Sequence, residues 1–161
     1  MTEQQEASKD AVMTRIGQAI MLLHGGDREE ARNRLGGLWS EIGEDGDALH
    51  RCTLAHYMAD AQDDHGDELA WDLRALTAAD SVTDERAAHH ADALAVRVFY
   101  PSLHLNLAAD YVKLQRPDAA RTHLDRARAA SGALARDGAD DGYAGGVRAA
   151  IARLELRLRD M

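Results

Sequence analysis

Three side chains that can bind a metal ion recur at four-residue spacing near the middle of the chain. Cys52, His56 and Asp60 carry a thiol, an imidazole and a carboxylate, and all three groups are metal ligands. Residues four apart share one face of a helix, so a helix here presents them together. A fourth ligand has to come from another helix, and His104 is the candidate. The same spacing also arises by chance in a chain rich in His and acids, and both interpretations stay open.

Catalytic motifs are lacking elsewhere in the sequence. There is no nucleophile motif and no pair of catalytic carboxylates in a strand context. Gly36-Gly37 lies inside a helical pattern and Gly145-Gly146 precedes one, so neither forms the strand-to-helix turn of a phosphate-binding loop. The sequence therefore predicts a protein without enzymatic activity and without a cofactor.

Composition points to packed helices in one domain. The 161 residues are 45% hydrophobic, much of it alanine, and only 4% aromatic, with two prolines. No apolar run reaches the roughly 20 residues that span a bilayer, and the N-terminus is too polar for a signal peptide. The single cysteine cannot form an internal disulfide. We expect a cytoplasmic protein, and the arginine bias over lysine suggests a GC-rich bacterial source.

Charge is uneven along the chain. Residues 1–80 hold 17 acids and 7 bases, whereas residues 81–161 hold 11 and 12, and the net charge is −9. A phosphate backbone is repelled by the acidic half, so we expect no nucleic-acid partner. A basic partner is favoured instead.

Apolar residues recur at helical spacing through almost the whole sequence. After a polar lead over residues 1–8, a single domain is expected over residues 9–161. The predicted helices span 9–24, 28–42, 47–63, 67–79, 85–99, 101–115, 117–131 and 147–160. Whether the fifth continues into the sixth through Pro101 is left open, because proline both starts and kinks helices. Glycines between 132 and 146 predict a flexible connecting segment before the last helix.

The stretch from Pro101 to Ala127 has the most specific pattern. Apolar residues at spacings of four and three define an inward stripe on its first helix. Alanines on the second helix allow two backbones to approach closely. Six residues fit one register that starts at Pro101: Leu107, Ala108, Tyr111, Ala120, Leu124 and Ala127.

This register resembles a tetratricopeptide repeat, a helix–turn–helix unit of about 34 residues. The resemblance is weaker over residues 12–42 and 51–79. His104, Gln115 and Gly132 depart from the Trp, Gly and Pro that are usual at those places. The resemblance implies an all-α antiparallel helix-hairpin array, a right-handed superhelix of about eight helices. The C-terminal helix is then the cap that covers the last apolar groove.

In such arrays, ligands lie in a concave groove lined by the first helix of each hairpin. The resemblance places seven candidate groove residues there: Cys52, His56, Gln62, Ser102, Leu105, Asn106 and Lys113. His56 and Asn106 fall on the same repeat position, and either can hydrogen-bond a peptide backbone or carboxylate. The alternative is that both are structural residues that tie helices together.

The sequence therefore favours a non-catalytic adaptor that binds a basic or apolar peptide or protein segment. The first alternative is a regulatory module that senses a small ligand or peptide and acts on a separate effector. The second is a metal-dependent enzyme in a helical bundle. We expect no membrane partner, because the last helix lacks Trp and Phe anchors. Homodimerisation is left open.

Overall fold

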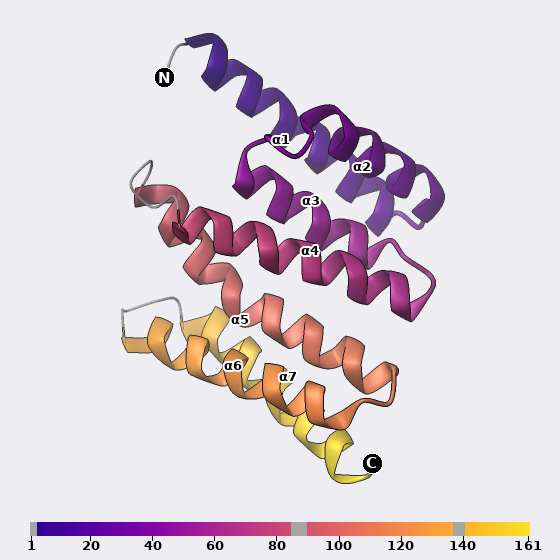
Figure 1. The fold of residues 1–161 in the computed structure, drawn as a ribbon, viewed down its shortest axis with the longest axis vertical. Coiled ribbons are helices and arrows are strands. Elements are labelled where there is room, and N and C mark those ends of the chain that lie inside the picture. Colours follow the sequence, from indigo (N-terminus) through magenta and orange to yellow (C-terminus); the bar gives the residue numbers. More distant parts are fainter. Residues whose placement is uncertain (1–2, 85–89, 137–140) are drawn as a thin grey trace. The chain divides into compact units, whose positions relative to one another are not determined.

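The computed structural model describes residues 3–84, 90–136 and 141–161, where every regular element is an α-helix (Figure 1). In chain order these are α1 (Glu3–His24), α2 (Arg28–Ile42), α3 (Ala48–Asp60), α4 (His65–Asp84), α5 (His90–Lys113), α6 (Pro117–Arg136) and α7 (Asp141–Arg159). The all-α prediction is confirmed for this part of the chain. No described helix is both long enough and apolar enough to cross a lipid bilayer.

The chain divides into two compact units, Met1–Ala78 and Ala79–Met161, and the single domain expected over residues 9–161 stays a prediction. Each unit has an apolar core of its own. The boundary falls inside α4, which continues to Asp84 although a helix end is predicted near Ala79. Burial explains the extension, because Ala75, Ala79 and Val82 are all buried at helical spacing.

In the first unit, α1 and α2 form a hairpin whose turn depends on glycine. Gly26 has φ of 93°, which L residues rarely adopt. The amide of Asp27 donates to the Leu22 carbonyl at 2.9 Å, and that of Gly26 to Leu23 at 3.2 Å. These two bonds are the Schellman pattern that closes a helix. At its other end α1 begins at Glu3 and not near Lys9, so residues 3–8 belong to the helix.

Side chains from α2 hold the end of α3. Arg28 donates to the Gln62 carbonyl at 2.9 Å, and Arg32 donates to the Ala61 carbonyl at 3.1 Å. Both guanidinium groups also contact the Asp63 carboxylate at 3.3 Å. Cations are favourable where a helix leaves carbonyls unpaired, so this cluster fixes α2 against the α3–α4 turn.

Two tryptophans join the packing of the first unit. The rings of Trp39 and Trp71 meet edge to face, with centroids 5.1 Å apart. Arg51 covers the ring of Trp39 at 4.0 Å, and Arg74 covers that of Trp71 at 4.3 Å. Aromatic and cation–π contacts of this kind indicate a packing role for both residues.

In the second unit, α5 runs through Pro101 without ending. The described part of the chain therefore has seven helices and not about eight, because the predicted fifth and sixth are one. A proline inside a helix costs about 3 kcal/mol through a lost hydrogen bond and a steric clash. Burial offsets this cost, since Pro101, Leu103 and Leu107 are almost completely excluded from solvent.

Helices α5 and α6 form an antiparallel hairpin with small residues where they meet (Figure 1). Ala108, Ala120 and Ala127 have no exposed surface, and Leu107 and Leu124 are buried with them. The close approach predicted from the alanines is confirmed. The turn places Gln115 at φ of 59°, with bonds from Arg116 to Tyr111 at 2.8 Å and from Gln115 to Val112 at 3.1 Å. This is the left-handed cap position where glycine is usual.

The last helix packs its apolar stripe on this hairpin, as predicted. Val147, Ile151, Leu154 and Leu158 are buried in one cluster with residues of α5 and α6. The predicted boundaries are wrong, however, because α6 extends to Arg136 and α7 begins at Asp141. Glycine lowers helix stability by only about 1 kcal/mol per residue, which packing of the stripe overcomes.

Candidate functional site

The proposed metal ligands on α3 do not assemble into a site in the described part of the chain, where no group of three His, Cys, Asp or Glu residues could hold a metal ion. Cys52 is fully buried, and burial raises the pKa of its thiol to about 12. Metals bind the thiolate, which is scarce near neutral pH at such a pKa. Asp60 is exposed on the same helix.

The candidate groove residues of α3 differ in accessibility. Cys52 has no exposed surface, so it lies in the interior and does not line an open groove. His56 is half-buried, and its ring meets that of Tyr57 edge to face at 4.9 Å. Burial lowers the pKa of His56, while the charge of Asp60 acts in the opposite direction. Gln62 is half-buried, and its side-chain amide donates to the Met58 carbonyl at 2.9 Å.

The candidate groove residues of α5 lie along one side of that helix. Ser102, Asn106 and Lys113 are separated by four and seven residues, which places them on a common face. Ser102 and Asn106 are half-buried, and Lys113 is exposed. Leu105 is also half-buried but packs partly on the apolar cluster shared with α6 and α7. This face therefore combines polar side chains with one apolar side chain that packs partly on that cluster.

On the opposite face of α5, Tyr100, His104 and Tyr111 stack with His123 of α6 in a column of four rings, which we call the ring column. Successive ring centroids are 6.1, 5.3 and 5.6 Å apart, with interplanar angles of 15°, 22° and 11°. The Nδ1 atoms of His104 and His123 are 3.1 Å apart, and the Tyr100 hydroxyl donates to Asp80 at 2.7 Å. His104, proposed above as a fourth metal ligand, thus pairs with His123.

Both imidazoles in the ring column are biased toward the neutral form. Burial, with the charges of His123 and Arg126, lowers the pKa of His104 to about 4. Burial and Arg126 also lower the pKa of His123. A hydrogen bond between two neutral imidazoles requires one Nδ1 to donate and the other to accept. Burial and the nearby charge of Arg126 disfavour a proton on either ring, which favours the neutral pair.

A cavity of about 170 Å³ opens beside one end of the ring column. Its lining residues come from α5 and α6: Arg97, Tyr100, His104, Ala130 and Ala133. The three from α5 recur at spacings of three and four, so they share one face of the helix. Flat rings, small apolar side chains and a guanidinium group therefore meet in one place.

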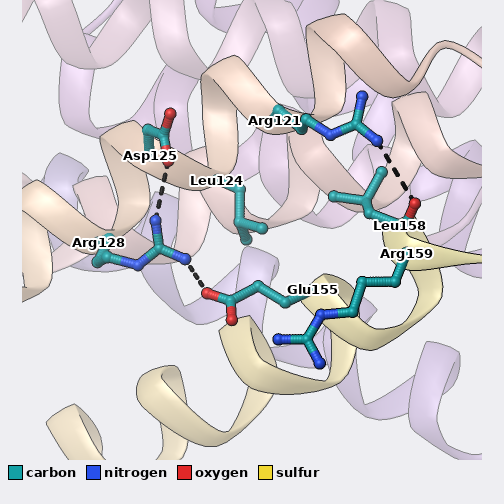
Figure 2. Close-up of a pocket in the computed structure, with 7 residues that line it drawn as sticks. All are labelled: Arg121, Leu124, Asp125, Arg128, Glu155, Leu158 and Arg159. Atoms are coloured by element: carbon teal, nitrogen blue, oxygen red, sulfur yellow. Dashed lines mark hydrogen bonds and ion pairs between the residues drawn. The ribbon is translucent and has the colours of Figure 1, made fainter.

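A second pocket, of about 260 Å³, lies between α6 and α7 (Figure 2). Arg128 bridges the carboxylates of Asp125 and Glu155, and Arg121 donates to the Leu158 carbonyl at 3.4 Å. Figure 2 shows Arg159 reaching over the same pocket from α7. Most of the charges lining it are thus compensated internally. The arrangement explains how α7 is held on α6 better than it explains ligand binding.

The ring column and the cavity beside it were not predicted from the sequence. Tyr100, His104 and Tyr111 are spaced by four and seven residues, which is a one-face pattern. A helix boundary at Pro101, which the sequence leaves open, would separate Tyr100 from the other two rings and hide this pattern. His123 is three residues after Ala120 and four before Ala127, so its place on the inward row could have been found.

Comparison with known proteins identifies no relative: no family model, curated protein or solved structure matches this chain.

Proposed function

We propose that this chain is a non-catalytic, tetratricopeptide-like adaptor that binds a peptide or protein segment in the cytoplasm. The observation that carries the proposal is the α5–α6 hairpin. Its small residues Ala108, Ala120 and Ala127 are completely buried at the positions where the repeat family nests its helices. The six matching residues and this packing together support a repeat architecture. Either observation alone would also fit a helical hairpin that is not a repeat.

The binding surface that we propose is the outward face of the first helix in each hairpin. On α5 this face carries Ser102, Asn106 and Lys113, on the side of the helix opposite the ring column. An amide and a hydroxyl there supply a donor and acceptors for a peptide backbone. On α3, His56 is the corresponding residue. The faces on α3 and α5 are two separate proposed binding surfaces, one in each unit.

Charge suggests what the partner looks like. The first 80 residues carry 17 acids against 7 bases, and several of those bases are already paired within the unit, as with Arg28 and Arg32 on Asp63. An extended acidic surface attracts a segment rich in Lys and Arg and accelerates its association. We therefore propose a basic or partly apolar peptide as the ligand.

A peptide array probed with the whole purified chain tests this function. Bound peptides should be enriched in Lys and Arg, and binding should weaken as salt is raised because the attraction is screened. Array positions that bind acidic peptides equally well would contradict the proposed charge selectivity. A scrambled version of each bound peptide separates sequence recognition from attraction by charge alone.

A further inference from the structure

The outward side of α7 carries positive charge that the described part of the chain does not neutralise. Four exposed arginines belong to this helix: Arg148, Arg153, Arg157 and Arg159. None of them makes an ion pair with a residue that the structure describes. Glu155 of the same helix is half-buried and pairs instead with Arg128 of α6. The four guanidinium groups are therefore available to a partner, on a chain whose net charge is −9.

An apolar strip lies between these arginines. Because successive residues of a helix are about 100° apart, Leu156 points directly away from the buried stripe from Val147 to Leu158. Its side chain is 59% exposed. Ala149 and Ala152 are exposed on the same side of the helix, three and four residues apart from their neighbours in the strip. Small side chains beside a leucine allow a second helix to approach closely.

Helix stability does not account for all four arginines. By the same geometry, Arg153 and Arg157 follow one edge of the strip, and Arg148 and Arg159 follow the other. Arg157 and Arg159 occupy the last turn, where the helix dipole favours cations. Arg148 and Arg153 lie outside that turn and gain nothing from it. Arg153 is also four residues before Arg157, a spacing at which like charges destabilise a helix.

Charge and shape together limit what fits this surface. Guanidinium groups bind carboxylates through two parallel hydrogen bonds, so the partner carries Asp or Glu. An apolar strip between two basic edges matches an amphipathic helix whose apolar ridge is flanked by acids. A nucleic acid fits less well, because the first 80 residues hold 17 acids against 7 bases and repel a phosphate backbone. A membrane surface also fits less well, since α7 has no Trp or Phe to anchor it.

From this arrangement we propose that the outward face of α7 binds an acidic amphipathic helix of a partner protein. The apolar ridge of that helix packs on Leu156, Ala149 and Ala152, and its carboxylates pair with the arginines on both edges. This partner has the opposite charge from the basic peptide proposed for the faces of α3 and α5. The α7 face is thus a second binding surface, and either surface can fail without the other.

A fluorescence-anisotropy titration of the full chain with a dye-labelled acidic peptide tests the proposal. The peptide is a helix of about 20 residues with Leu and Ala along one face and Glu along both edges. It should bind saturably, and the same peptide with Gln in place of Glu should bind at least about tenfold more weakly. Replacing its Leu residues with Ser should weaken binding severalfold. Absence of saturable binding, or equal affinity for the Gln peptide, would overturn the proposal.

Variants locate the binding. Arg153→Gln combined with Arg157→Gln should weaken the acidic peptide at least about tenfold. Arg116→Gln combined with Arg126→Gln is the matched control, because it removes two exposed charges outside α7 and should have little effect. Leu156→Gln should weaken binding severalfold. Unchanged affinity in the folded Arg153 and Arg157 double variant, or an equal loss in the control pair, would place the peptide elsewhere and contradict the proposal.

Two further measurements separate the acidic helix from other occupants of this face. Sedimentation velocity of the chain alone should show no self-association that the Arg153 and Arg157 double variant removes. Such self-association would assign the face to a second copy of the chain and overturn the proposal. Phosphatidylserine vesicles should not bind. Vesicle binding that the same variant removes would assign the face to a membrane surface, with the same consequence.

Discussion

His104 and His123 face each other across the α5–α6 interface with their Nδ1 atoms 3.1 Å apart. Each ring also stacks on a tyrosine, His104 on Tyr100 and His123 on Tyr111. The polar contact therefore lies within a continuous ring column and not at an isolated surface position. Because both pKa values are lowered, the pair holds the two helices together in its neutral state.

This pair makes stability depend on pH. Unfolded imidazoles gain protons near their ordinary pKa of about 6.5, whereas His104 in the folded chain does so only near 4. Since the folded pKa is the lower one, the stabilising contribution is complete above pH 6.5 and is lost as pH falls through about 4. Urea unfolding at a series of pH values should show this decline. His104→Phe keeps a ring in the column and should reduce the decline; an identical pH profile would contradict the assignment.

The helix crossing should tolerate no larger side chain. Ala127 is completely buried between helices, so Ala127→Leu should destabilise the chain by about 1–3 kcal/mol through overpacking. Ala129→Leu, on the exposed side of the same helix, serves as the matched control and should be nearly neutral. Denaturant unfolding monitored by circular dichroism compares the two. Equal stability of both variants would show that the crossing is not tightly packed.

The turn between α5 and α6 offers a stabilising substitution. Gln115 has φ of 59°, which costs a residue with a Cβ atom about 1–2 kcal/mol. Gln115→Gly should raise the free energy of unfolding by about 0.5–1 kcal/mol, after the greater freedom of glycine in the unfolded chain is deducted. Gly26→Ala, at the left-handed cap of α1, should have the opposite effect because φ is 93° there. Thermal unfolding of both variants tests whether Gln115→Gly is stabilised and Gly26→Ala is destabilised.

Cys52 should be unreactive in the folded protein. Its thiol is buried, and its pKa of about 12 leaves almost no thiolate near neutral pH. Alkylation of Cys52 by iodoacetamide, measured by mass spectrometry, should be slow in the native state and rapid in urea. Similar rates in both conditions would mean that α3 opens readily.

The sequence was most informative where burial follows helical spacing. Leu107, Leu124 and the stripe from Val147 to Leu158 are all buried as their periodicity predicts. It was least informative where packing opposes local preference. Pro101 and the glycines after Asp141 argue for helix ends, yet burial of the surrounding apolar residues keeps both helices continuous.

The candidate sites show a similar division. Spacing along one helix correctly places Cys52, His56 and Asp60 on α3, but it cannot say which of them reaches solvent. The ring column and the cavity beside it join α5 to α6, so their formation depends on the register of one helix against another. Single-helix periodicity contains no information on that register.

Peptide binding is the property on which the proposed function depends most. The direct measurement is a fluorescence-anisotropy titration of the full chain with a dye-labelled basic peptide selected from the array. Binding should be saturable, should weaken between about 0.05 and 0.5 M salt, and should fall at least about tenfold in His56→Ala or Asn106→Ala. Ser40→Ala and Thr122→Ala, at exposed positions on second helices, should bind like the unmodified chain. Failure of every basic or apolar peptide to bind, or full binding by folded His56→Ala and Asn106→Ala, would contradict the adaptor function.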